Sequence, residues 1–93
     1  MSLKFEWHPR KASVNRQKHR VSFEEASTVF ADSLSATVFD INHSDDEDRY
    51  ITIGFSEQKR LLMVAHTEQG DTIRIISARE LTPLEKQDYE DET

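Results

Sequence analysis

The sequence predicts an α+β fold: a mainly antiparallel sheet with two N-terminal helices packed on one face and a short C-terminal helix. Two helix-start signals come first, at Pro9 and at the pair Ser22 and Glu25. Strand-like segments then follow one another, and the last of them are joined by connections short enough for hairpins. A threonine followed by a proline begins one more helix near the C-terminus. At 93 residues, the chain is expected to form a single domain, residues 1–93, with one modest core.

The N-terminal segments come first in chain order. Residues 4–7 alternate polar and aromatic side chains, which is typical of a short edge strand. Residues 9–19 contain no helix breaker after the initial proline, but Ala12 and Val14 are their only apolar residues. We therefore expect either a thin surface helix or a helix whose basic face has a partner.

A second helix is predicted from Ser22 to about residue 33. Ser22 can accept a hydrogen bond as the N-cap, and Glu25 can reach back to the Ser22 amide in a capping box. Apolar residues then recur at helical spacing and should face the core. These residues are Phe23, Ala26, Val29 and Phe30.

The second half of the chain is rich in strand signals. Apolar residues alternate or run together in four segments, and the acidic segment 42–48 separates the first of them from the rest as a polar loop. Thr82, Pro83 and Glu85 form the N-cap, first position and capping-box position of a final acidic helix. The four predicted strands cover residues 36–41, 49–55, 61–68 and 71–80.

The last predicted strand has apolar residues on both faces, which is typical of a strand inside a sheet. It also carries Arg74 and Arg79, and arginine is costly in such a place unless it is paired or reaches solvent. The two arginines are five residues apart, so a regular strand would point them to opposite faces. Both can serve one site only if the strand bulges, for example near Ser77, or if Arg79 lies beyond the end of the strand.

Composition excludes several classes of function. There is no cysteine, so disulfides, thiol nucleophiles and cysteine-ligated zinc are ruled out. The N-terminal residues lack the apolar segment of a signal peptide, and no apolar run approaches the roughly 20 residues of a membrane helix. We therefore expect a cytoplasmic protein that does not enter a membrane.

Charge is unevenly distributed along the chain. The net charge is −6, but residues 1–20 hold six basic side chains and one acidic one, whereas residues 21–48 hold eight acidic side chains and no Lys or Arg. Salt screens distant charges within about 8–10 Å, so a locally basic surface can still attract phosphate.

No metal site is predicted. The four histidines have no HxxxH or HExxH spacing, and the acidic run 45–48 lacks the glycine and alternating ligands of a calcium loop. The acidic segment is therefore interpreted as a solvated turn. Neither a phosphate-binding glycine loop nor a serine-triad motif is present.

A set of basic side chains could cleave RNA without a metal. That reaction needs a group to take the 2′-hydroxyl proton, a group to protonate the leaving 5′-oxygen, and positive charge at the phosphate. Each candidate also has a purely structural interpretation; for example, the arginines could pair with Glu68 or Glu80. The candidates are Lys18, His19, Arg49, His66, Arg74 and Arg79.

The chain resembles the BrnT family of bacterial type II toxins. The resemblance begins with Phe-Glu-Trp-His-Pro-Arg-Lys-Ala at residues 5–12 and ends with Ile-Arg-Ile-Ile-Ser-Ala-Arg at residues 73–79. Between them, the similar segments are residues 15, 18–19, 21–26, 29–32, 49–54, 60–62 and 66–68. The sequence departs from the family at Arg20, where members commonly have glycine, and at Gln69, where they often have a basic residue.

The resemblance implies a RelE-like fold and a metal-independent ribonuclease without a cofactor. It implies that Arg79 and Arg74 contact the phosphate and the transition state, that His66 is an acid or base, and that Lys18 or His19 is its counterpart. Arg49 and Arg16 would be further RNA-phosphate ligands.

The resemblance also implies the partners: an RNA substrate and a BrnA-like ribbon-helix-helix antitoxin, with operator DNA contacted only through the antitoxin. A homodimer or a toxin–antitoxin heterotetramer would fit these partners. The alternative function is a binding module with weak or no catalysis, which holds the antitoxin and helps to repress its own operon. The acidic net charge and Gln69 favour that alternative.

Overall fold

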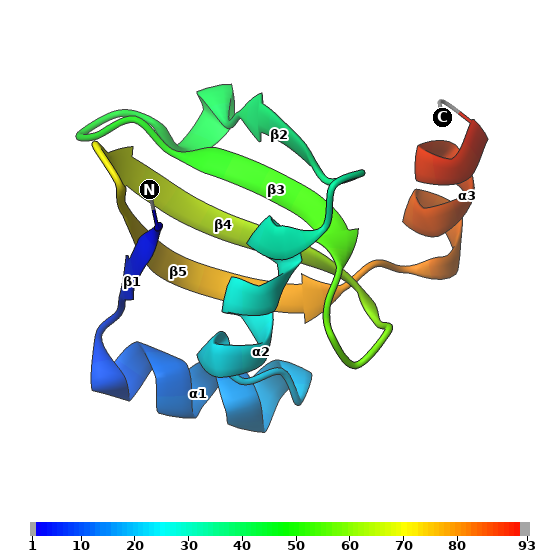
Figure 1. Ribbon diagram of the computed structural model, residues 1–93, viewed down its shortest axis with the longest axis horizontal. Coiled ribbons are helices and arrows are strands. Elements are labelled where there is room, and N and C mark those ends of the chain that lie inside the picture. Colours follow the sequence, from blue (N-terminus) through cyan, green and yellow to red (C-terminus); the bar gives the residue numbers. More distant parts are fainter. Residues whose placement is uncertain (1, 92–93) are drawn as a thin grey trace.

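The computed structural model describes residues 2–91, which form a five-stranded sheet and three α-helices (Figure 1). The strand order is β1-β5-β4-β3-β2, with β1 parallel to β5 and all other neighbours antiparallel. The predicted α+β class with a mainly antiparallel sheet is therefore confirmed. In chain order the elements are β1 (Lys4–Glu6), α1 (Pro9–His19), α2 (Phe23–Thr28), a 3₁₀ helix (Val29–Ala31), β2 (Ala36–Phe39), a second 3₁₀ helix (Ile41–His43), β3 (Tyr50–Phe55), β4 (Leu61–Gln69), β5 (Thr72–Glu80) and α3 (Pro83–Asp91).

The hydrophobic core lies between one face of the sheet and the first two helices. From the α2 region, Phe23, Ala26 and Val29 are fully buried, as the helical spacing predicted, and Val21 just before the helix is buried too. Phe30, the fourth predicted position, is partly buried and packs against this core. Ring contacts extend this core towards β1, since Phe5 packs on Phe30 with ring centroids 5.3 Å apart. The sheet contributes Leu62, Val64, Ile73, Ile75 and Ala78.

Polar contacts hold α1 against β5, because this helix offers few apolar side chains. Asn15 is buried, and its Nδ2 donates to the carbonyl oxygens of Val21 at 3.0 Å and Ala78 at 2.8 Å. Its Oδ1 accepts from the Ala78 amide at 3.0 Å. Asn15 thereby supplies hydrogen-bond partners to backbone groups of β5 in the part of that strand where β1 no longer pairs with β5.

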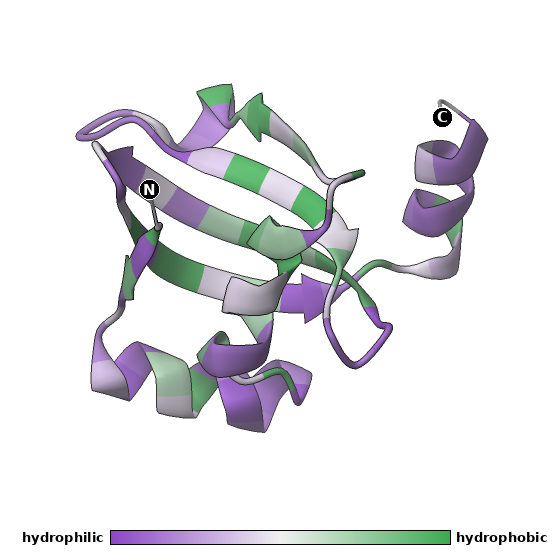
Figure 2. Ribbon diagram, in the orientation of Figure 1, coloured by the Kyte–Doolittle hydropathy of each residue, from purple (hydrophilic) through white to green (hydrophobic). Residues whose placement is uncertain are grey.

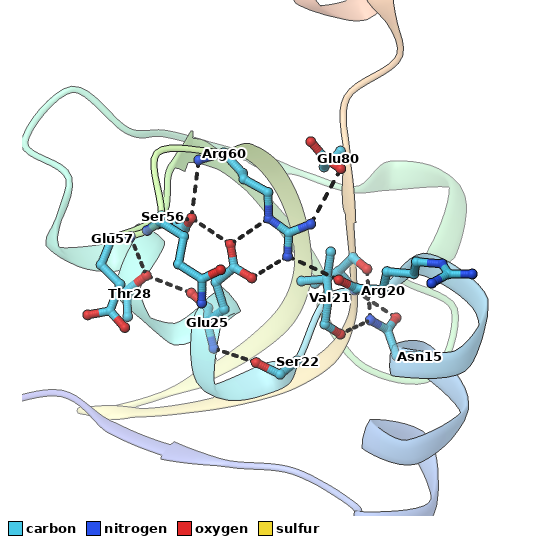
Figure 3. A network of polar contacts seen from close by, with 12 residues as sticks. Asn15, Arg20, Val21, Ser22, Glu25, Thr28, Ser56, Glu57, Arg60 and Glu80 are labelled. Carbon is cyan, nitrogen blue, oxygen red and sulfur yellow. Dashed lines mark hydrogen bonds and ion pairs between the residues drawn. The ribbon is translucent and has the colours of Figure 1, made fainter.

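The predicted capping box at α2 forms only in part (Figure 3). Ser22 Oγ accepts from the Glu25 amide at 3.0 Å, as expected. The Glu25 carboxylate points inward instead of back to Ser22, and it accepts from Ser56 Oγ at 2.7 Å and Arg60 Nε at 2.9 Å. A buried carboxylate gains more from a guanidinium than from an amide, which explains the difference.

A β-bulge interrupts the pairing of β4 with β5. Ala65 pairs with Ser77 and His66 with Ile75, so Ile76 is an extra residue on β5. Arg74 lies opposite Thr67 and Arg79 opposite Met63. Thr67 and Met63 are four residues apart on β4 and share a face, so the two arginines also share a face.

This arrangement confirms that β5 is irregular between Arg74 and Arg79. We call the face that carries them the open face, because α1 and α2 cover the opposite one (Figure 1).

The C-terminal helix α3 makes little contact with the rest of the molecule. It begins with a complete capping box, in which Thr82 N donates to Glu85 Oε1 at 2.9 Å and Glu85 N donates to Thr82 Oγ1 at 3.2 Å. None of its residues is buried, and it is mostly hydrophilic (Figure 2). Tyr89 ties it to the body by donating to the Leu34 carbonyl at 3.0 Å.

Candidate functional site

A shallow groove of about 370 Å³ lies on the open face of the sheet. Apolar side chains from the three central strands form its floor: Ile51, Met63, Ala65 and Ile76. Polar side chains from α1, β5 and the segment after β2 also line it: His19, Asp40, His43, Arg49, Ser77 and Arg79. The fold therefore gathers two histidines, two arginines and an aspartate around one groove, from segments far apart in the sequence.

Arg79 lines the groove, and its guanidinium is paired with a carboxylate of α3. Its Nη1 and Nη2 donate to the two carboxylate oxygens of Glu85 at 2.8 and 2.9 Å, a bidentate pair with a residue of α3. Arg79 lowers the pKa of Glu85 to about 2, so the carboxylate is ionised at neutral pH. The Arg79 guanidinium thus holds one planar carboxylate through two parallel hydrogen bonds, and phosphate is a group of oxygens that the same fork geometry matches.

The segment from Asp40 to Arg49 is closed by hydrogen bonds that place both residues at the groove. Asp40 N donates to the Arg49 carbonyl at 2.8 Å, and Arg49 N donates to Ser44 Oγ at 3.0 Å. Ser44 Oγ in turn donates to the Asp40 carbonyl at 2.6 Å. This closure explains why β2 ends at Phe39, two residues before the predicted end of the strand at residue 41.

Asp40 and His43 are functional candidates that the sequence did not reveal. The 3₁₀ helix places them three residues apart on one side of a turn, where His43 Nδ1 and Asp40 Oδ2 are 3.0 Å apart. The Asp-x-x-His spacing is the only signal in the sequence, and it is weak without knowledge of the turn. The sequence places His43 in the acidic segment 42–48, which is interpreted as a solvated turn, and Asp40 in the predicted strand 36–41.

Arg74 also lies on the open face, but it does not line the groove that Arg79 lines. It pairs with Glu47 of the acidic segment and borders a small pocket together with Glu6 and Thr67. Neither arginine pairs with Glu68, and Glu80 meets Arg79 only through its backbone carbonyl, at 3.2 Å. The carboxylates that pair with Arg74 and Arg79 are thus Glu47 and Glu85, and Glu68 and Glu80, the possible partners named from the sequence, do not take that role.

His66 lies on the helix-covered face and is fully buried. Its Nε2 is 2.7 Å from Thr52 Oγ1, and its ring contacts Phe30 edge-on and stacks with Tyr50. Burial lowers the pKa of this imidazole. The structure therefore does not bring His66 together with the arginines, because β4 alternates its side chains and places this one in the core.

The remaining candidates lie on α1, and only one of them reaches the groove. His19, the last residue of the helix, lines it. Lys18 is exposed in the same last turn. Arg16 instead borders a separate groove between α1 and α2, beside Ser22 and Phe23.

The part of the chain from residue 2 to residue 91 has neither a metal cluster nor a membrane-spanning helix. Within these residues, no group of three or more His, Cys, Asp or Glu side chains is arranged to hold a metal ion. In the same part of the chain, no helix has both the length and the apolar character needed to cross a membrane.

Comparison with known proteins supplies the family. No curated protein sequence matches the chain. Among solved structures, the fold is similar to that of the Brucella abortus ribonuclease toxin BrnT, with a TM-score of 0.63 and 19% sequence identity. The similar region covers 87% of this chain and 99% of the Brucella protein. The family model described as "Ribonuclease toxin, BrnT, of type II toxin-antitoxin system" matches residues 7–85, which is most of the chain. The chain therefore belongs to the BrnT family of ribonuclease toxins of type II toxin-antitoxin systems.

Proposed function

We propose that the protein is a metal-independent endoribonuclease toxin that cleaves RNA in the groove on the open face. The observation that carries the proposal is the convergence of Arg79, Arg49 and His19 from a strand, a loop and a helix on one groove. These residue types can supply both the positive charge and a proton-transfer group.

The proposed reaction is attack of a ribose 2′-oxygen on the adjacent phosphorus. Arg79 and Arg49 bind the phosphate and stabilise the negative charge that develops on it. His19 is one proton-transfer group, because its imidazole lines the groove beside the two arginines.

The other candidate residues have secondary roles in this proposal or none. Lys18, next to His19, adds positive charge at the rim, and Arg74 extends phosphate binding along the open face. Arg16 would meet RNA only if the strand also followed the groove between α1 and α2. His66 is assigned to the core, since its ring is enclosed and already bonded to Thr52.

A type II toxin has an antitoxin partner, and we propose that this partner is a BrnA-like ribbon-helix-helix protein. It would inhibit the toxin by covering the open-face groove, and operator DNA would be contacted only through it. A heterotetramer with a dimeric antitoxin, or a homodimer of the toxin alone, is the proposed assembly, and the cytoplasm is the proposed place of action.

Induced expression without an antitoxin tests the proposal. Wild-type protein should arrest growth and deplete cellular RNA, whereas Arg79→Ala should do neither while remaining folded by circular dichroism. Arg16→Ala, which removes the same charge outside the groove, is the matched control and should stay toxic. Full toxicity of Arg79→Ala would remove Arg79 from the site.

A binding module remains the second candidate, because carboxylates engage both Arg74 and Arg79. The same experiment separates the two functions. A pure binding module would leave growth and RNA unchanged when expressed alone, yet would still bind its antitoxin and strengthen repression of the operon.

A further inference from the structure

We propose that His43 is the second catalytic residue of the ribonuclease and that Asp40 positions it. This inference rests on the proposed function, since it names a residue for the same reaction. It starts from a gap in the site. Cleavage of RNA without a metal needs both a base and an acid, and the burial of His66 leaves His19 without a counterpart.

The groove offers few groups that can transfer protons near neutral pH. Its two arginines remain protonated and therefore serve as cations. Within residues 2–91, no imidazole or carboxylate forms a hydrogen bond to Ser77, so nothing there would activate the Ser77 hydroxyl that lines the groove. His43 is the remaining imidazole, and it lines the groove together with His19 and both arginines.

The contact with Asp40 gives His43 the geometry of a general base. Because Nδ1 is 3.0 Å from Asp40 Oδ2, the carboxylate accepts the Nδ1 proton and leaves Nε2 with its lone pair. The carboxylate also stabilises the imidazolium that forms when Nε2 takes a proton. The side chain of Asp40 is only 12% exposed, whereas that of His43 is 67% exposed, so the ring can reach a bound strand.

The backbone fixes this pair in place. The two residues belong to one 3₁₀ turn, and Ser44 bridges Asp40 to Arg49 at the base of the loop. The groups proposed to accept the proton and to hold the phosphate are therefore carried by the same closed segment.

The step balances with the groups present. His43 Nε2 takes the proton from the ribose 2′-hydroxyl as the 2′-oxygen forms its bond to phosphorus. The bond from phosphorus to the 5′-oxygen breaks, and protonated His19 donates a proton to that oxygen. The products are a 2′,3′-cyclic phosphate and a free 5′-hydroxyl, and exchange with water returns both histidines to their starting states.

The test uses the purified full chain, a short fluorogenic single-stranded RNA and a non-cleavable 2′-O-methyl version of it. His43→Gln should lower kcat by about 10²- to 10⁴-fold and remove the low-pH limb of the kcat profile. Its dissociation constant for the 2′-O-methyl RNA should stay within about twofold of wild type. Asp40→Asn should lower kcat less than His43→Gln does, since the imidazolium loses its carboxylate, and should leave the dissociation constant for the 2′-O-methyl RNA within about twofold of wild type. Asn42→Ala, a change in the same turn outside the groove, is the control and should retain wild-type kcat.

The outcomes separate this inference from the proposed function. If His43→Gln keeps the wild-type kcat and pH profile while Arg79→Ala is inactive, the role of His43 is overturned and the ribonuclease stands. If wild-type protein cleaves neither this RNA nor cellular RNA, the proposed function fails, and the catalytic role of His43 fails with it.

Discussion

Glu25 is a carboxylate almost enclosed by protein, and its environment shows how one residue can organise several segments. Arg60 binds both of its oxygens, and Ser56 donates to one of them (Figure 3). Hydrogen bonding to Arg60 lowers the pKa of Glu25 despite the opposing effect of burial. Arg60 also donates to the carbonyl of Arg20 at 3.0 Å, so the α1–α2 turn is tied to the β3–β4 hairpin.

Arg60→Met is predicted to lower the free energy of unfolding by about 3 kcal/mol, because it leaves a buried carboxylate without its cation. Urea denaturation at pH 7 measures the loss. The double variant Glu25→Gln and Arg60→Met is the control and should recover part of the stability, since a neutral amide costs less to bury. Equal losses in the single and double variants would show that packing by Arg60, and not charge, is responsible.

His66 is predicted to make stability depend on pH. Burial lowers its pKa from the ordinary value of 6.5, so below that pH the unfolded chain binds a proton that the folded protein resists. The unfolded state then holds more protons, and stability must fall as pH drops below about 6.5. The contributions of Glu25 and Glu85, whose pKa values are lowered from 4.5, are lost only at more acidic pH.

Denaturation midpoints between pH 5 and pH 7.5 measure this dependence. His66→Gln, which can still hydrogen-bond Thr52, should have a flatter profile than wild type over that range. Identical slopes would mean that His66 does not carry the effect.

At the scale of elements, β5 shows what the sequence could and could not predict. The odd spacing of Arg74 and Arg79 predicted an irregular strand, and the bulge at Ile76 provides it. The same alternation, applied to β4, places the His66 side chain on the face of the sheet that carries Thr52 and places the two arginines on the other face. That inference needs the strand pairing, which the sequence does not state. Residue type and the family resemblance therefore group His66 with the arginines, whereas the strand pairing separates them.

Helix α3 supplies the carboxylate that pairs with Arg79. It is held by the Glu85 pair and the Tyr89 hydrogen bond and buries no residue. In Glu85→Gln, the side-chain amide can still accept the capping hydrogen bond from Thr82 N, but the ion pair with Arg79 is lost. RNA phosphate would then no longer compete with a carboxylate for Arg79. We expect several-fold tighter binding of 2′-O-methyl RNA, measured by fluorescence anisotropy.

Asp88→Asn is the matched control for this prediction. Asp88 is exposed on the same helix, and the change removes the same charge without touching Arg79. Equal gains in both variants would attribute the effect to net charge, and no gain in Glu85→Gln would show that α3 does not limit binding.

On the scale of the whole molecule, the sequence predicted the layers better than the site. Helix starts and hairpins follow from local patterns, and the structure confirms them. The groove depends on the loop from Asp40 to Arg49, whose closure through Ser44 brings two distant sequence positions together. No periodic pattern encodes such a closure, which is why Asp40 and His43 were missed.

The uneven charge distribution leads to a prediction about salt. The net charge of −6 opposes general attraction to RNA, so binding must come from a few local phosphate contacts. Each such contact with single-stranded nucleic acid contributes a slope of about −0.7 to a plot of log K against log salt concentration. Arg49→Ala should therefore reduce the magnitude of the slope by about 0.7, because it removes one contact in the groove.

Binding of 2′-O-methyl RNA from low to physiological salt measures these slopes. Arg16→Ala removes an equal charge from the groove between α1 and α2 and should leave the slope unchanged. If both variants reduce the slope equally, RNA follows the basic side of α1 as well as the open face. If neither does, the phosphate contacts lie elsewhere, and the assignment of Arg49 is wrong.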